Sequence, residues 1–133
     1  NEKIIYEDAK ILLNELSNKE VLQACVSASP YKLLLKKLKE VDIENSFKYI
    51  IGGDMVNRNK PYPDIYNKAI SELGTYKNLI IEDSPTGISS GKASDSFVLA
   101  IDRGMFSKDD LSQADLIVED LNLETVESIF QSL

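Results

Sequence analysis

Three short polar stretches of the sequence could together bind a phosphate group. Residues 27–30 (Ser-Ala-Ser-Pro) offer hydroxyls and backbone N–H groups between a predicted strand and a predicted helix, where unpaired N–H groups and the helix dipole favour an anion. Lys60 precedes two prolines and could supply a point positive charge to a phosphoryl group. Glu82 and Asp83 end an apolar run, and a hard cation such as Mg²⁺ would relieve the repulsion between two adjacent carboxylates. A hydroxyl, an ammonium and a carboxylate pair are together the groups that hold a Mg²⁺-bound phosphate.

Each stretch also has a purely structural interpretation. A serine of the first stretch could cap the helix that follows, with Pro30 in the first helical turn. Lys60 could be a solvated surface residue. Asp83 or Ser84 could cap the next helix while Glu82 stays solvated. The convergence of the three stretches, more than any one of them, favours the phosphate interpretation.

The elements that must position these groups alternate along the chain. Apolar runs are separated by amphipathic stretches whose leucines and isoleucines recur at helical spacing. This order predicts a three-layer α/β/α Rossmann-like fold with a mostly parallel sheet, in which sites lie beyond the carboxyl ends of the strands. Helices are expected over residues 7–17, 31–41, 64–73, 86–94 and 123–130, and strands over 21–27, 48–51, 79–81, 97–101 and 116–118.

Composition excludes several other kinds of protein. The chain has 133 residues, enough for one ordinary domain without disulfide bonds, and a net charge of −7, which weighs against nucleic acid or an anionic membrane as partner. It contains no histidine and one cysteine, which excludes Ser-His-Asp and Cys-His catalysis and imidazole or thiolate metal sites. Cys25 lies in an apolar run and is expected to be a core residue of a cytoplasmic protein.

At these positions the sequence resembles the haloacid dehalogenase-like (HAD) superfamily, and most closely its β-phosphoglucomutase-like phosphatase branch. The stretches VSASP, NKPYPDIY and IEDSPTGISSGKAS follow the order and spacing of that family's second, third and fourth motifs. The resemblance runs from about residue 6 to the C-terminus. It implies a HAD-like core and a Mg²⁺-dependent phosphatase or phosphomutase. Such an enzyme would act on a small phosphorylated metabolite, such as a sugar phosphate, through an aspartyl-phosphate.

The resemblance also implies roles for individual residues. The Ser27 hydroxyl and the Ala28 backbone N–H would bind the phosphoryl group, and Lys60 would neutralise charge on that group and on the nucleophile. Asp83 would ligate Mg²⁺, and Glu82 would do so directly or through water. Further residues expected in the pocket are Ser29, Asp54 and Ser84.

One motif of the family is missing from the sequence. The family's nucleophile is the first aspartate of a D-x-D motif on the first core strand, and no D-x-D occurs here. The nearest imitation is residues 4–8, which end in Asp8. The second aspartate of the motif would then fall at residue 10, which is a lysine, and the stretch leads directly into a predicted helix. We therefore expect residues 1–133 to be the C-terminal part of a HAD-like core domain, lacking the central strand and the helical cap and inactive alone. The expected partner is the missing N-terminal segment or a swapped second copy.

Two alternatives stand beside this interpretation. The chain could be a HAD-like remnant that binds phosphate, metal or a partner without turnover. It could also be a receiver-like signalling domain, which is likewise doubly wound and acidic and binds Mg²⁺. A receiver would carry its acidic pair and phosphoacceptor aspartate on early strands, followed by a serine or threonine and then a lysine. The order here is serine, lysine and then the acidic pair, which opposes that assignment.

Overall fold

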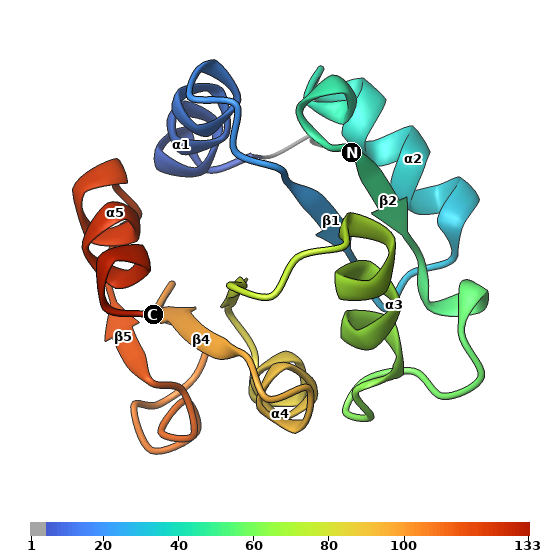
Figure 1. The fold of residues 1–133 in the computed structure, drawn as a ribbon. Helices are drawn as coiled ribbons and strands as arrows, with labels where there is room; N and C mark the ends of the chain where they lie inside the picture. The colour runs from blue at the N-terminus through green and yellow to red at the C-terminus, as the bar shows by residue number, and fades with distance from the viewer. Residues whose placement is uncertain (1–4) are drawn as a thin grey trace.

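Helices and strands alternate in the order that the sequence predicts (Figure 1). The computed structural model describes residues 5–133, so the first residue of the 4–8 stretch lies outside the described residues. The helices are α1 (Glu7–Asn18), α2 (Tyr31–Glu40), α3 (Asp64–Leu73), α4 (Pro85–Ala93) and α5 (Leu123–Ser132), with 3₁₀ turns η1 (Glu44–Ser46) and η2 (Gly53–Met55). The strands are β1 (Ala24–Val26), β2 (Tyr49–Ile51), β3 (Leu79–Glu82), β4 (Phe97–Ile101) and β5 (Leu116–Val118). Within residues 5–133, none of the helices has the length and apolar character needed to cross a membrane.

Side chains that alternate along the strands create two packed faces. On one face, Ile51 and Ile80 pack with Ile65 of α3 and Ile88 of α4. On the other face, residues 79 and 81 of β3 pack against α1 and α5, and residues 25 and 50 pack against α2. Figure 1 shows the same division, with α1, α2 and α5 on one side of the strands and α3 and α4 on the other. The predicted three-layer α/β/α fold is confirmed.

The first strand is shorter than its apolar run. The expected strand began at residue 21, but β1 begins at Ala24, where parallel pairing with β2 starts. Because β2 has only three residues, it offers no partner to Val21 and Leu22, whose exposed fractions are 38% and 48%. The strand boundary is therefore decided by the length of the partner and not by the apolar run itself.

The strands form two separate parallel sheets. One sheet has the order β1-β2 and the other β3-β4-β5, and within residues 5–133 no strand pairs β1 with β3. Between them lies an apolar cavity of about 470 Å³, which we call the β1–β3 groove. Its walls come from β1, β3, α1, α3 and α5, including Leu12, Cys25, Ala69, Ile81 and Val126. The groove lies between β1 and β3, and the sequence analysis predicts that the central strand of the core is missing from these residues.

Candidate active site

A second pocket, of about 480 Å³, opens at the carboxyl ends of β1 and β3. Its position follows from the parallel topology, because parallel strands bring their carboxyl ends to one edge of the fold. Residues from three separate parts of the chain meet there: the turn after β1, the loop before α3 and the turn after β3. Six predicted site residues line this pocket: Ser27, Ala28, Lys60, Glu82, Asp83 and Ser84.

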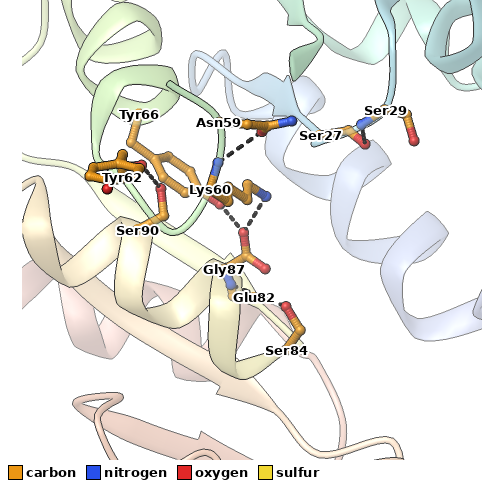
Figure 2. A network of polar contacts seen from close by, with 10 residues as sticks. All are labelled: Ser27, Ser29, Asn59, Lys60, Tyr62, Tyr66, Glu82, Ser84, Gly87 and Ser90. Atoms are coloured by element: carbon orange, nitrogen blue, oxygen red, sulfur yellow. Dashed lines mark hydrogen bonds and ion pairs between the residues drawn. The ribbon is translucent and has the colours of Figure 1, made fainter. Parts of the chain in front are cut away.

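A buried ion pair lies in the wall of the pocket. Lys60 Nζ is 2.7 Å from Glu82 Oε2, and the two side chains are only 10% and 8% exposed. Tyr66 of α3 donates its hydroxyl to the same carboxylate oxygen, and Lys60 Nζ lies 5.2 Å from the centre of the Tyr66 ring. Figure 2 shows Lys60 and Tyr66 both directed toward the Glu82 carboxylate. The ammonium is thus held at a fixed place beside the pocket.

Asn59 connects the Lys60 loop to the turn after β1. Its side-chain amide donates to the Ala28 carbonyl at 3.0 Å, and its Oδ1 accepts the Lys60 backbone N–H at 2.8 Å. Ser90 of α4 holds the same loop from the other side by donating to the Tyr62 carbonyl at 2.6 Å. These bonds set the separation between the lysine and the residues that follow β1.

The turn after β3 places the carboxylates and begins α4. Ser84 is the N-cap of α4, and its hydroxyl accepts the Gly87 N–H at 3.1 Å, so the capping interpretation of Ser84 is confirmed. Ser84 also lines the pocket. Gly87 lies against the Glu82 carboxylate, and a Cβ at this position would overlap it. The absence of a side chain at residue 87 therefore leaves room for the buried Glu82.

A Gly87→Ala substitution is expected to displace the Glu82 carboxylate from Lys60 and to lower the free energy of unfolding by about 1–3 kcal/mol. Urea titration followed by circular dichroism measures the change. Ser89→Ala, on the same helix, removes one exposed hydrogen bond to Gln113 and serves as the control, with an expected change within about 0.5 kcal/mol. A Gly87→Ala protein as stable as the Ser89→Ala control would contradict this expectation, because the Glu82 carboxylate would then have an alternative position without loss of stability.

Two predicted pocket residues have other contacts in the structure. Ser29 donates its N–H to the Ser27 hydroxyl at 3.1 Å, and its carbonyl accepts the Gly53 N–H at 2.8 Å. Asp54 accepts the Tyr31 N–H at 2.8 Å and so satisfies the first turn of α2 from a distant loop. Neither Ser29 nor Asp54 lines the pocket. No serine side chain caps α2, whose N-cap position is Pro30, so that interpretation of the Ser-Ala-Ser-Pro stretch is wrong.

The acidic pair divides into two environments. Glu82 is buried and its Oε2 is engaged by Lys60 and Tyr66, whereas Asp83 is exposed at the pocket. Within the described residues, no three Asp, Glu, His or Cys side chains form a group that could hold a metal ion. Mg²⁺ commonly takes one or two carboxylates and completes its shell with waters and phosphate oxygens. The exposed carboxylate of Asp83 and the buried carboxylate of Glu82 both line the pocket, so they can supply the one or two carboxylates that a Mg²⁺ ion takes.

Burial controls the protonation of two neighbouring groups. Burial, together with the negative charge of Glu82, raises the pKa of the Tyr66 hydroxyl well above its usual value. The hydroxyl therefore keeps its proton and can donate it to Glu82. Burial also raises the pKa of the Cys25 thiol to about 11, which keeps it in the unreactive thiol form at neutral pH. Cys25 is partly buried and packs against the cluster of Leu34, Leu38 and Ile43, which agrees with its predicted place in the core.

Sequence reasoning missed two residues of this network. Tyr66 lies in a predicted helix and is not among the residues predicted for the pocket. The requirement that a buried tyrosine hydroxyl find a partner was the available signal. Asn59 begins the NKPYPDIY stretch, but no local pattern indicates its partner, since its role depends on the Ala28 carbonyl from a distant turn.

The chain is similar to known proteins of one family. A family model of haloacid dehalogenase-like hydrolases matches residues 2–101. A phosphorylated carbohydrates phosphatase of Thermotoga maritima is 29% identical over 83 residues, covering 61% of this chain and 38% of the relative. The crystal structure of a β-phosphoglucomutase from Clostridium difficile matches with a TM-score of 0.84 at 22% identity, over 96% of this chain and 57% of that one.

A third relative has an anion in its structure. A HAD-family hydrolase from Deinococcus radiodurans, solved with bound phosphate and sodium, matches with a TM-score of 0.83 at 25% identity, over 96% of this chain and 59% of that one. The chain thus spans between about two-fifths and three-fifths of the length of these three relatives. The match over residues 2–101 confirms the family resemblance: this chain belongs to the haloacid dehalogenase-like hydrolase family.

Proposed function

We propose that this chain carries the phosphoryl-binding part of a Mg²⁺-dependent phosphatase-type site. The observation that supports the proposal is the meeting of Ser27, Lys60 and Asp83 around one pocket, although they lie far apart in the sequence. A hydroxyl donor, a fixed cation and an exposed carboxylate are complementary to a phosphate ester with a bound cation. Phosphoryl transfer depends mainly on such positioning and charge neutralisation.

Each residue of the pocket has a defined role in this proposal. The Ser27 hydroxyl and the Ala28 N–H donate to oxygens of the phosphoryl group. Lys60 neutralises charge on the same group. Its ammonium has three N–H donors, so the bond to Glu82 leaves two of them for substrate. Glu82 and Tyr66 keep Lys60 in place, so their contribution is to positioning.

The same pocket would hold the metal. Asp83 would bind Mg²⁺ directly, and Glu82 would bind it through water, because its Oε2 is already shared by Lys60 and Tyr66. The cation would screen the negative charge of the phosphoryl oxygens. Water, substrate oxygens and a carboxylate from elsewhere in the protein would complete its coordination.

The proposal includes an occupant for the β1–β3 groove. We propose that an extended segment of the same polypeptide lies there, parallel to β1 and β3, and that residues 1–133 are the C-terminal part of the core domain. The groove has strand edges on two sides and apolar helices on both faces, which suits an apolar strand buried within a parallel sheet. The greater length of the three relatives supports the presence of such a segment.

The carboxyl end of this segment would reach the pocket between Ser27 and Asp83. The family resemblance implies that it carries the aspartate nucleophile that residues 1–133 lack. The substrate class follows from the pocket and from the relatives' names, one of which refers to phosphorylated carbohydrates. We therefore propose a small phosphorylated metabolite as the substrate.

Asp83→Asn tests the proposed metal role. In the protein expressed from its complete gene, this substitution is expected to lower Mg²⁺-dependent turnover of p-nitrophenyl phosphate by at least about 100-fold. Titration calorimetry should show a parallel loss of Mg²⁺ affinity. The matched control is Asp109→Asn, an exposed aspartate outside the pocket, which should change neither quantity. Unchanged Mg²⁺ affinity in Asp83→Asn would contradict the metal assignment.

The same experiment distinguishes the phosphatase-type site from the non-catalytic alternative. A wild-type protein that binds Mg²⁺ and inorganic phosphate but hydrolyses no phosphate ester would support a binding remnant. The absence of the nucleophile motif from residues 1–133 is the observation that keeps this alternative open.

A further inference from the structure

Asn59 is connected to Ser27 through a single peptide unit. The side-chain amide of Asn59 donates to the Ala28 carbonyl at 3.0 Å, and the N–H of that same peptide unit, which belongs to Ser29, donates to the Ser27 hydroxyl at 3.1 Å. We call these consecutive bonds the Asn59–Ser27 hydrogen-bond series. Figure 2 shows Asn59 between Lys60 and Ser27. Because Ser27 lines the pocket, the series ends at the candidate phosphoryl-binding position.

The direction of each bond decides what the Ser27 hydroxyl can do. Asn59 Oδ1 accepts the Lys60 backbone N–H at 2.8 Å, so Nδ2 is the atom that faces the Ala28 carbonyl. The reversed amide would place two donors together and two acceptors together. The Ser27 oxygen accepts an N–H in turn, which directs the proton of the hydroxyl toward a different acceptor. The series therefore sets Ser27 as a donor, which is what a phosphoryl oxygen requires.

Bonds in such a series strengthen one another. A carbonyl that accepts a hydrogen bond makes the N–H of its own peptide unit a better donor, and a hydroxyl that accepts an N–H becomes a better donor as well. The backbone on the other side is fixed too, because the Ser27 N–H donates to the Ile51 carbonyl at 3.0 Å. The Ser27 hydroxyl is thus both held in place and polarised.

The fold leaves room for the Asn59–Ala28 bond at Gly53. A Cβ on Gly53 would overlap both the Ala28 oxygen and Asn59 Nδ2. Gly53 also donates its N–H to the Ser29 carbonyl at 2.8 Å, so the turns after β1 and β2 and the loop before α3 meet here. These three elements pack directly against one another, so the series does not depend on what fills the β1–β3 groove.

We propose that Asn59 is a positioning residue for phosphoryl transfer, which acts through the Ala28–Ser29 peptide to hold and polarise the Ser27 hydroxyl. Asn59 does not line the pocket, so its effect on substrate passes through residues that do. The expected effect on turnover rests on the proposed function, whereas the hydrogen-bond series itself does not. Removing the Asn59 amide is expected to weaken the contribution of Ser27 and to leave Mg²⁺ binding at Asp83 unchanged.

A double-mutant cycle on the protein expressed from its complete gene tests the path to Ser27. Ser27→Ala is expected to lower kcat/KM for p-nitrophenyl phosphate about 100-fold, and Asn59→Ala about 10-fold. If Asn59 acts through Ser27, the double variant should lose about 100-fold, whereas independent effects would give about 1000-fold. Titration calorimetry should show wild-type Mg²⁺ affinity in Asn59→Ala, which a general disturbance of the pocket would change.

Nuclear magnetic resonance tests the series without reference to turnover. In Asn59→Ala, the Ser29 amide proton should move upfield and exchange faster with solvent, because its bond to the Ser27 hydroxyl weakens. Asn59→Asp should have the same effects, since an ionised carboxylate still accepts the Lys60 N–H but cannot donate to Ala28. The aspartate variant replaces the alanine variant in both measurements if the alanine variant does not fold.

Asn122 provides the matched control. Its side chain also bonds to the backbone, by accepting the Thr125 N–H at 2.8 Å at the start of α5, and it does not line the pocket. Asn122→Ala is expected to lower the free energy of unfolding by about 1 kcal/mol through loss of this cap. It should change neither the Ser29 resonance nor kcat/KM.

The two measurements distinguish the possible failures. A Ser29 amide proton at its wild-type position in the Asn59 variant would overturn the hydrogen-bond series. A shifted resonance combined with wild-type kcat/KM, or with losses that multiply in the double variant, would overturn the positioning role through Ser27. If the wild-type protein hydrolyses no phosphate ester, the proposed function fails, and the Ser29 resonance alone decides whether the series exists.

Discussion

Replacing Lys60 with alanine is expected to lower phosphate-ester turnover by at least about 100- to 1000-fold and the free energy of unfolding by about 3–5 kcal/mol. The catalytic loss follows because the substitution removes a fixed positive charge from the pocket. The loss of stability follows because the Glu82 carboxylate, only 8% exposed, would remain buried without its cation. Steady-state kinetics and urea titration of the protein expressed from its complete gene measure the two effects.

A double variant separates the two consequences of this substitution. Lys60→Met combined with Glu82→Gln removes both charges, while residue 82 can still accept the hydrogen bond from Tyr66. Replacing a buried ion pair with groups of similar volume is often close to neutral, so most of the stability should return. Turnover should not return, because the ammonium is still absent. Substantial turnover in either variant would contradict the assignment of Lys60.

Lys92 provides the matched control for Lys60. Its Nζ lies 2.7 Å from Asp115 Oδ2, the same separation as in the Lys60–Glu82 pair. The Lys92 and Asp115 side chains are about one-third exposed, so solvent screens this pair and limits its contribution to about 1 kcal/mol. Lys92→Ala should therefore cause a small loss of stability and no change in turnover.

The second large effect concerns the β1–β3 groove. Cys25 lies in β1 and lines the groove, so a strand lying there would cover its thiol. Cys25 is expected to react with a thiol reagent such as DTNB at least about 100-fold more slowly in the product of the complete gene than in the 133-residue chain alone, because reaction in the former requires local opening. Absorbance at neutral pH follows both reactions.

An exposed cysteine gives the reference rate for this comparison. Ser128→Cys places a thiol on the solvent side of α5, and it should react equally fast in both proteins. Equal rates at Cys25 as well would contradict the proposed occupant. Protection of Cys25 that increases with the concentration of the 133-residue chain would instead indicate a second copy in the groove.

The order of the elements could be predicted because the apolar runs and amphipathic stretches of this sequence are clearly separated. The strand edges could not be predicted as well, because they depend on pairing. Val21 and Leu22 have the residue types of a strand, yet β2 does not extend far enough to pair with them. The missing D-x-D motif indicated a missing strand, and the separate sheets agree with that indication.

The pocket itself could be predicted because three strand-end motifs must meet at one edge of a parallel sheet. The partners of each side chain could not, since they are chosen by tertiary packing. Glu82 and Asp83 are adjacent and chemically similar, but the alternation of β3 directs Glu82 toward Lys60 and Tyr66 and leaves Asp83 exposed. In the same way, Asp54 satisfies the first turn of α2, a contact that no local pattern indicates.

Release of inorganic phosphate from p-nitrophenyl phosphate by the protein expressed from its complete gene tests the central claim most directly. The account predicts turnover that requires Mg²⁺, is abolished by EDTA, and is lost in both Lys60→Ala and Asp83→Asn. Turnover should persist in Lys92→Ala and Asp109→Asn. No phosphate release above the background of the Asp83→Asn variant, from a protein shown to be folded, would contradict the claim that Ser27, Lys60 and Asp83 form a phosphatase-type site.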